Sequence, residues 1–124
     1  MTETTKRVEK PWGYEIWWAR TDRYVGKILH VKKGESLSLQ YHNVKDETIL
    51  VQSGRLLLET GKRGEAGELA RTEMGPGGSF HITPGMVHRM TGLEDCDIFE
   101  VSTPELDDVV RLEDRYGRAG TSNP

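Results

Sequence analysis

The stretch Ser36-Leu37-Ser38-Leu39-Gln40-Tyr41-His42 alternates between polar and apolar side chains without a break. Successive side chains of a β-strand point to opposite faces, so this alternation predicts a strand with the leucines and the tyrosine on one face. The serines, Gln40 and His42 then share the other face. That polar face has two interpretations: it faces water, or it lines a pocket inside a barrel.

Further strands are predicted on both sides of this stretch. Glycine and proline interrupt the sequence at short intervals, and the segments between them are rich in Val, Ile, Leu, Trp and Tyr, which is typical of strands. Besides residues 36–42, strands are predicted at 14–19, 25–31, 47–52, 55–60, 79–82, 88–91 and 97–102, with one short strand near Leu69. Helical periodicity is absent before residue 104. Many short strands between turns predict an all-β sandwich or small barrel.

Length and composition narrow the class of protein. The 124 residues suit one domain, with a core at about 8–104 and a charged tail at 105–124 that either folds over the barrel mouth or forms a solvated helix. A net charge of -3 without a basic stripe argues against nucleic-acid binding. The longest apolar run, residues 16–19, is too short for a membrane span. One cysteine, Cys96, and a polar start to the chain predict a cytoplasmic protein.

Two segments carry side chains that suit a metal ion. Gln40 and His42 lie two residues apart on one strand, and a turn at 43–46 would return Glu47 beside them. The Pro84-Gly85 turn leads into His88 at the start of another strand. Two imidazoles, a carboxylate and an amide oxygen predict a divalent-metal site with open positions. The alternatives are that these residues are ordinary polar barrel lining, and that Gln40 orients water or substrate instead of coordinating.

The same two segments resemble the two motifs of the cupin superfamily. Gln40 stands where the first motif usually has a histidine, while His42 and Glu47 match; residues 83–88 match the proline-glycine turn and last histidine of the second motif. The segment 37–42, together with Lys10-Pro11-Trp12-Gly13-Tyr14-Glu15 and residues 107–118, is similar to the C-terminal cupin domain of type II mannose-6-phosphate isomerases. The resemblance spans roughly residues 8–118. It implies a double-stranded β-helix, or jelly-roll, barrel.

The resemblance also implies a function and a set of site residues. The chain is expected to bind a sugar or sugar phosphate and to interconvert aldose and ketose, using a divalent metal: zinc first, with manganese, nickel or iron as alternatives. The implied metal ligands are Gln40, His42, Glu47 and His88, and the implied catalytic residues are Glu47, Lys45 and His81. The candidate substrate-binding residues are Lys27, Tyr41, Arg89, Arg111, Tyr116 and Arg118.

Departures from the isomerase pattern leave other functions open. Lys45 takes the place of an arginine, and lysine lacks the bidentate fork that grips a phosphate or an enediolate. Thr48 and Ile49 take the place of a histidine and a tryptophan. Turnover of mannose 6-phosphate is therefore expected to be weak or absent. The alternatives are a protein that binds carbohydrate or another small ligand, and an iron-dependent dioxygenase, since two histidines and a carboxylate also suit iron(II).

A homodimer is expected. The first predicted strand is apolar and carries Trp17 and Trp18, which must point to opposite faces of the sheet. At least one of them belongs to the core or to an interface. The leucine face of residues 36–42 also needs a cover, and a second copy would protect such an edge; the family resemblance implies dimers as well.

Overall fold

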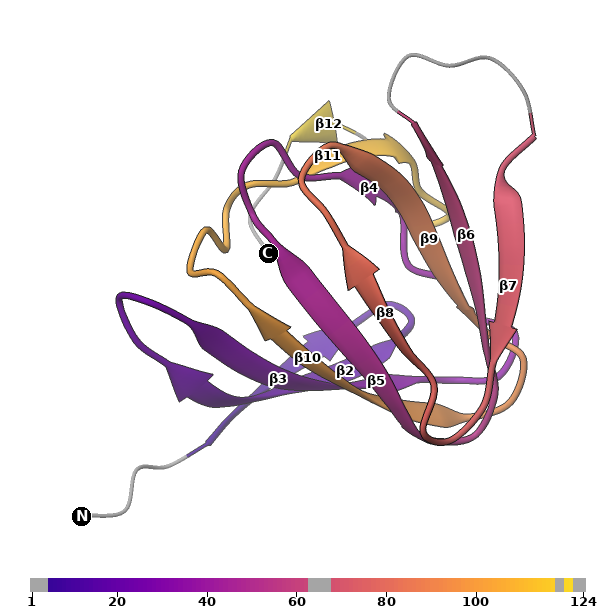
Figure 1. Ribbon diagram of the computed structural model, residues 1–124. Coiled ribbons are helices and arrows are strands. Elements are labelled where there is room, and N and C mark those ends of the chain that lie inside the picture. Colours follow the sequence, from indigo (N-terminus) through magenta and orange to yellow (C-terminus); the bar gives the residue numbers. More distant parts are fainter. Residues whose placement is uncertain (1–4, 63–67, 118–119, 122–124) are drawn as a thin grey trace.

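The computed structural model describes residues 5–62, 68–117 and 120–121, which form two sheets facing each other (Figure 1). The strands are β1 (Lys6–Lys10), β2 (Gly13–Arg20), β3 (Val25–Val31), β4 (Leu39–Tyr41), β5 (Glu47–Ser53), β6 (Leu56–Lys62), β7 (Ala70–Met74), β8 (Ser79–Ile82), β9 (Met86–Gly92), β10 (Cys96–Ser102), β11 (Val110–Glu113) and β12 (Gly120–Thr121). The N-terminal sheet has the order β1-β2-β3-β10-β5-β8, and the C-terminal sheet has the order β12-β11-β4-β9-β6-β7. The predicted all-β jelly roll is confirmed.

Most predicted strands lie where the sequence placed them. β3 and β8 coincide with the predicted ranges, and β2, β5, β6, β9 and β10 differ from them by at most two residues at either end. The structure adds β1, β11 and β12, which the sequence did not predict. β1 pairs with β2 alone and is therefore an edge strand. Its many charged residues are typical of such strands, because they discourage pairing with another chain. β11 pairs with β4, so the solvated helix considered for the tail is wrong for this segment.

The stretch 36–42 is less regular than its alternation suggests. Strand β4 covers Leu39–Tyr41, and Ser36 pairs with Thr91 through an isolated bridge. Leu37 therefore packs in the main core, while Leu39 and Tyr41 form a separate cluster with Val87. Ser38 and His42 are buried, so the polar face lines a pocket; the water-facing interpretation is wrong.

The inward face of the N-terminal sheet changes character along its strands. Core residues such as Leu29, Ile49 and Ile98 fill one end of the space between the sheets. Toward the other end, the same alternating rows on β3, β5 and β10 continue with Lys27, Glu47 and Glu100, all buried. Buried charges are stable when they are paired. This end of the barrel is therefore built as a polar site above an apolar base.

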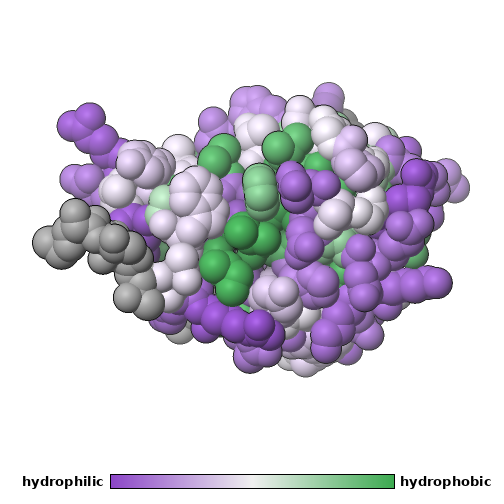
Figure 2. Space-filling model, turned by 90° about the horizontal axis from the view of Figure 1, so that it is seen from below, coloured by the Kyte–Doolittle hydropathy of each residue, from purple (hydrophilic) through white to green (hydrophobic). Residues whose placement is uncertain are grey.

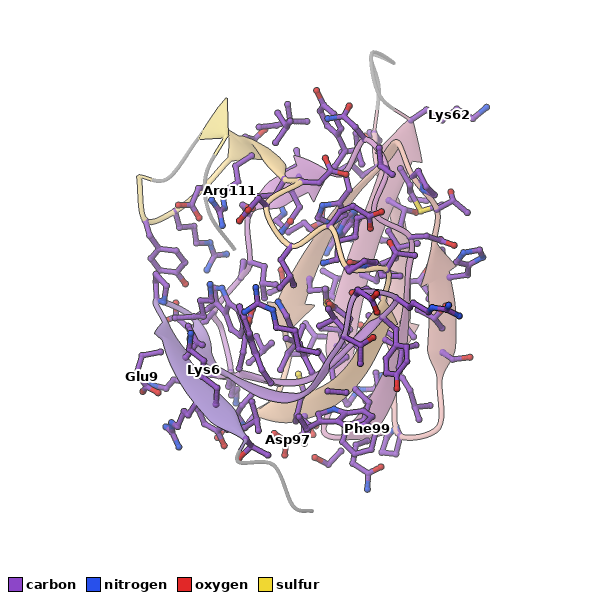
Figure 3. The ribbon with its side chains drawn as sticks, turned by 90° about the vertical axis from the view of Figure 1, so that its left-hand side faces the viewer. Lys6, Glu9, Lys62, Asp97, Phe99 and Arg111 are labelled. Atoms are coloured by element: carbon purple, nitrogen blue, oxygen red, sulfur yellow. The ribbon has the colours of Figure 1, made fainter. Side chains whose placement is uncertain are left out.

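The outer face of the N-terminal sheet exposes apolar side chains. Leu50 and Phe99 are paired across β5 and β10, each 36% exposed, and Val101 and Trp18 are 52% and 51% exposed. Figure 2 views the molecule from below and shows apolar residues gathered in the middle of the visible face, with hydrophilic residues around them. In Figure 3 Phe99 lies at the lower margin of the barrel, away from Arg111. By contrast, Leu37 and Leu39 are covered within the subunit itself.

Within the described residues, no helix is long and apolar enough to cross a membrane. The backbone hydrogen bonds are those of the two sheets and the turns that join them.

The homodimer remains a prediction, and the outer apolar face gives it a location. We expect the chain to sediment as a dimer at micromolar concentration, and Phe99→Asp to shift it to monomer, because a charge there would be buried without a partner. Leu112→Asp is the control, since Leu112 is equally apolar and 47% exposed but lies on β11 of the other sheet. A monomeric wild type would contradict the prediction.

Candidate functional site

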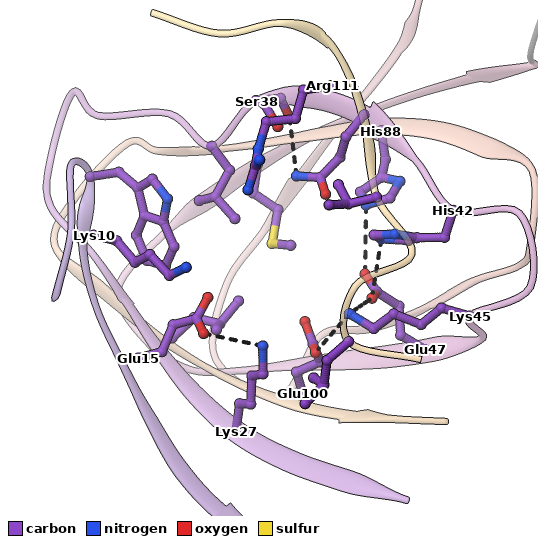
Figure 4. Close-up of a pocket in the computed structure, with 17 residues that line it drawn as sticks. Lys10, Glu15, Lys27, Ser38, His42, Lys45, Glu47, His88, Glu100 and Arg111 are labelled. Atoms are coloured by element: carbon purple, nitrogen blue, oxygen red, sulfur yellow. Dashed lines mark hydrogen bonds and ion pairs between the residues drawn. The ribbon is translucent and has the colours of Figure 1, made fainter. Parts of the chain in front are cut away.

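A cavity lies between the sheets at the polar end of the barrel (Figure 4). Its lining from the C-terminal sheet and the segments beside it includes Ser38, Gln40, His42, His88 and Arg111. Facing these residues are Glu15, Lys27, Lys45, Glu47 and Glu100, on the N-terminal sheet and the loop that precedes β5. Leu106, Val109 and Arg111 also line the cavity, so the described part of the tail covers one of its sides.

Three side chains form a cluster suited to a metal ion. His42 follows β4, Glu47 begins β5, and His88 lies in β9, and one ligand atom of each falls within 4.8 Å of the others. The His42 Nε2 atom lies 3.5 Å from Glu47 Oε2, and His88 Nε2 lies 3.6 Å from Glu47 Oε1. All three residues are buried, with exposed fractions of 5%, 3% and 1%. The hairpin predicted at 43–46 is wrong, because β4 and β5 belong to different sheets; the loop between them crosses from one sheet to the other and brings Glu47 opposite His42.

Backbone carbonyls set the orientation of both imidazoles. His42 Nδ1 lies 2.5 Å from the carbonyl oxygen of Asp108, and His88 Nδ1 lies 3.0 Å from that of Met86. A carbonyl only accepts hydrogen bonds, so each Nδ1 carries the proton and each Nε2 turns a lone pair toward Glu47. Burial lowers the pKa of His42 to about 4, although the nearby Glu47 carboxylate opposes this, so the ring is neutral at pH 7.

The donor set fits a divalent cation. Two imidazole lone pairs and a carboxylate point at one another, and a positive ion between them satisfies all three groups. Nitrogen and oxygen ligands of this kind serve zinc, manganese, nickel and iron alike. Gln40 lines the cavity and is paired in register with His88, and its amide nitrogen donates to the Ser38 carbonyl oxygen at 3.4 Å.

Ion pairs hold the other buried charges. Lys45 Nζ lies 3.0 Å from Glu47 Oε2 and 3.4 Å from Glu100 Oε2, and Lys27 Nζ lies 3.1 Å from Glu15 Oε1. Burial alone would raise the pKa of Glu47, but the Lys45 ammonium holds it well below its usual range. Burial raises the pKa of Glu100, with Lys45 acting in the opposite direction.

Asp108 fixes the loop between β4 and β5. Its carboxylate accepts backbone N–H groups from Asn43 at 3.0 Å, Val44 at 2.6 Å and Lys45 at 2.9 Å. Its carbonyl oxygen is the partner of His42. One residue of the tail therefore holds both a metal-ligand candidate and the lysine beside the cluster.

The structure brings some of the predicted site residues together. Gln40, His42, Lys45, Glu47, His88, Lys27 and Arg111 all line the cavity. Sequence reasoning missed Glu15, Ser38, Glu100 and Asp108. Glu100 could have been found, because it lies on the same face of a predicted strand as Cys96 and Ile98, the face that the strand turns toward the core.

Other predicted residues lie away from the cavity. Tyr41 packs with Leu39 and Val87 on the opposite face of the C-terminal sheet. His81 is exposed, with its Nε2 2.6 Å from Asp46 Oδ1.

Two more of the predicted substrate-binding residues have partners elsewhere. Arg89 pairs with Glu59 at 3.0 Å and with Glu113 at 3.5 Å. The Tyr116 hydroxyl donates to the Glu35 carboxylate. Arg118 lies outside the described residues.

The three tryptophans are placed differently. Trp12 is 2% exposed, in the core and against the cavity. The Trp17 indole donates to Glu15 Oε1 at 2.8 Å, while Trp18 is exposed.

A jelly-roll barrel that holds a histidine and glutamate cluster between its two sheets defines the chain as a cupin domain. Residues 1–114 match the family described as mannose-6-phosphate isomerase C-terminal, and the chain belongs to that family.

Relatives of this protein carry the domain as one part of a longer chain. The protein is 36% identical over 118 residues to the mannose-1-phosphate guanylyltransferase ManC of Salmonella typhimurium, covering 91% of this chain and 23% of ManC. It is 33% identical over 118 residues to the xanthan biosynthesis protein XanB of Xanthomonas campestris, covering 91% of this chain and 24% of XanB. The chain thus spans about a quarter of the length of these relatives.

Solved structures share the fold at low sequence identity. The capsular polysaccharide assembling protein CapF of Staphylococcus aureus superposes with a TM-score of 0.75 at 20% identity, over 91% of this chain and 34% of CapF. KdgF from Halomonas sp. gives 0.67 at 20% identity, over 85% of this chain and 89% of KdgF. Oxalate decarboxylase from Bacillus subtilis gives 0.71 at 17% identity, over 87% of this chain and 30% of that one.

The contacts of Asp108 lead to a prediction about stability. Asp108→Ala should lower the free energy of unfolding by about 1–3 kcal/mol, because three backbone donors lose a charged acceptor. Burial alone would raise the pKa of Asp108, but these donors lower it from 3.8 to about 2, so the carboxylate stabilises the folded state fully above pH 3.8. That contribution is lost as the pH falls through about 2.

Urea unfolding at several pH values measures this effect. The difference between wild type and Asp108→Ala should shrink as the solution is acidified below pH 3.8. The adjacent, exposed Asp107 provides the control, and Asp107→Ala should change stability little. Equal losses in the two variants would show that the loop does not depend on the Asp108 carboxylate.

Proposed function

We propose that this chain is a metal-dependent cupin that binds a sugar or sugar phosphate between its sheets and interconverts aldose and ketose forms. The observation that carries the proposal is the convergence of His42, Glu47 and His88, with both imidazole Nδ1 atoms bound to backbone carbonyls. We assign the metal to these three residues, with Gln40 as a fourth ligand. Zinc is our first choice, and manganese, nickel or iron would suit the same ligands.

The cavity supplies groups for proton transfer between adjacent carbons. A bound divalent metal supplies Lewis-acid stabilisation to the oxygens of an open-chain sugar. The Lys45 ammonium, which lies beside the cluster and pairs with Glu100, donates to negative charge that develops on a substrate oxygen. Glu47 is the carboxylate that we assign to proton transfer. His81 faces away from the cavity, so we no longer propose it as a proton carrier.

The relatives support a sugar as the ligand. The names of ManC and XanB refer to mannose 1-phosphate and xanthan, and that of the family refers to mannose 6-phosphate. Lysine at position 45 cannot form the two parallel hydrogen bonds of an arginine, and a charged hydrogen bond contributes roughly 1.5–3 kcal/mol. We therefore propose turnover of mannose 6-phosphate reduced by one to two orders of magnitude, or a preference for another sugar. The substrate contacts that we propose are Lys27 and Arg111, which line the cavity.

Two alternatives use the same site. A carbohydrate-binding domain without turnover would need the cavity and its buried charges alone. An iron-dependent dioxygenase would use the two histidines and the carboxylate as ligands for iron(II).

The cytoplasmic location expected from the sequence stays a prediction.

The metal site has a direct test. We expect the purified chain to bind about one divalent ion per subunit, and His88→Ala to lose stoichiometric metal while staying folded, because the sheets and not the ion support the barrel. Elemental analysis and circular dichroism measure the two properties. His81→Ala is the matched control, since this histidine is exposed, pairs with Asp46 and is not among the residues that line the cavity. Retention of metal by His88→Ala would show that the site is assigned wrongly.

The activity is tested with a panel of aldoses and their phosphates in deuterated water. We expect exchange of the proton at the second carbon, or ketose formation, with at least one sugar, and its loss in Glu47→Gln. Oxygen uptake by iron-loaded protein would instead favour the dioxygenase. Sugar binding without exchange would favour the binding domain. Strong turnover of mannose 6-phosphate that Lys45→Ala leaves unchanged would contradict the role of Lys45.

A further inference from the structure

The Lys45 ammonium lies at the oxygen that a metal would use. Its Nζ atom is 3.0 Å from Glu47 Oε2, the same oxygen that faces His42 Nε2 at 3.5 Å. Lys45 is 7% exposed, so water screens its charge poorly. The lysine and a metal ion would therefore compete for the same carboxylate oxygen.

Binding of a metal ion beside the Lys45 ammonium is costly in free energy unless the lysine has a second partner. A cation coordinated by Glu47 would lie within about 5 Å of the ammonium, because a metal–oxygen bond adds at most about 2.2 Å. Two positive charges at that separation repel strongly in a buried site. The metal can be accommodated when a nearby anion takes over the lysine.

Glu100 is placed to be that anion. Its Oε2 atom lies 3.4 Å from Lys45 Nζ, on the side away from the two histidines (Figure 4). Glu100 is 4% exposed and lies in the middle of β10, where the register pairs it with Ile49 of β5 and Lys27 of β3. The charged groups that face it are Lys45, Glu47, Lys27 and Glu15.

We infer that Glu100 is a positioning residue of the metal centre, which holds the Lys45 ammonium when a metal ion takes its place on Glu47. Lys45 is then a resident cation that neutralises Glu47 before metal binds and turns wholly to Glu100 afterwards. The inference rests on the proposed metal binding and assigns Glu100 a role that the sequence did not reveal.

Counting charges gives the direction of the effect. Glu47, Glu100 and Lys45 together carry a charge of about -1, which becomes about +1 when a divalent ion binds. With glutamine at position 100 the same set begins near 0 and ends near +2 in a buried site. Glu100→Gln should therefore weaken metal binding by about 10–100-fold, the range typical of partners that support a metal ligand.

The experiment titrates zinc and manganese into the metal-free full-length chain by calorimetry, with a competing chelator where binding is tight. Its variants are Glu100→Gln, Lys45→Met and the double variant. Lys45→Met should bind metal at least as tightly as wild type, because the competing cation is gone. The double variant should regain the affinity lost in Glu100→Gln, because the ammonium that Glu100 balances is gone and the charge again runs from about -1 to about +1. It also removes both partners together, so it tests the inference even where Glu100→Gln folds poorly.

Glu15→Gln is the matched control. Glu15 is also a buried glutamate of the N-terminal sheet that pairs with a lysine at 3.1 Å, and it lines the same cavity. It should change metal affinity by no more than two- to threefold. A second readout is the metal-induced shift of the melting temperature, which should be larger in Lys45→Met than in wild type, because its metal-free form leaves Glu47 without its ammonium.

The outcomes separate the inference from the metal site. If wild type binds metal and Glu100→Gln binds it as tightly, the inference is overturned and the site stands. If Glu15→Gln weakens binding as much as Glu100→Gln does, the effect is one of total charge and the positioning role is overturned. If wild type binds no divalent metal, the proposed metal-dependent function falls and the inference falls with it.

Discussion

Pairing of buried charge is the constraint on which the polar end of the barrel depends. Strands β3, β5 and β10 present apolar side chains at one end of their inward faces and Lys27, Glu47 and Glu100 at the other. A charge left without a partner in such a place costs several kcal/mol. The partners Glu15 and Lys45 therefore belong to the fold as much as to the site.

Much of the fold could be predicted because the signals were local. Alternation and turn residues located β3 and β8 to the residue, and the spacing of His42, Glu47 and His88 located the metal-ligand candidates. What failed depends on contacts between distant segments. β1 and β11 are short edge or near-edge strands rich in charged residues, and they become strands by pairing with β2 and β4.

The site residues show the same difference between local signals, which the sequence reveals, and long-range contacts, which it does not. Alternation predicts on which face of a strand a side chain lies, as Glu100 shows. Residues 36–42 are not one regular strand, however, so Leu37 packs in the main core while Leu39 and Tyr41 pack in a separate cluster. Single residues chosen by chemical type were less reliable. His81 and Arg89 have suitable side chains, yet both point to surfaces where Asp46 and Glu59 engage them. Sequence alone does not contain the tertiary neighbours that decide between these outcomes.

The hydrogen bonds of Asp108 make the order in which the chain is synthesised relevant to the site. The three candidate ligands all lie within the first 88 residues, but the carbonyl that orients His42 is 66 positions further along than that histidine. A nascent chain that has paired β4 with β9 still lacks this carbonyl until the tail emerges and β11 adds to the sheet. Closing so long a loop is slow compared with forming a hairpin. The proposed metal centre therefore depends on a partner of His42 that the chain supplies only with its C-terminal segment.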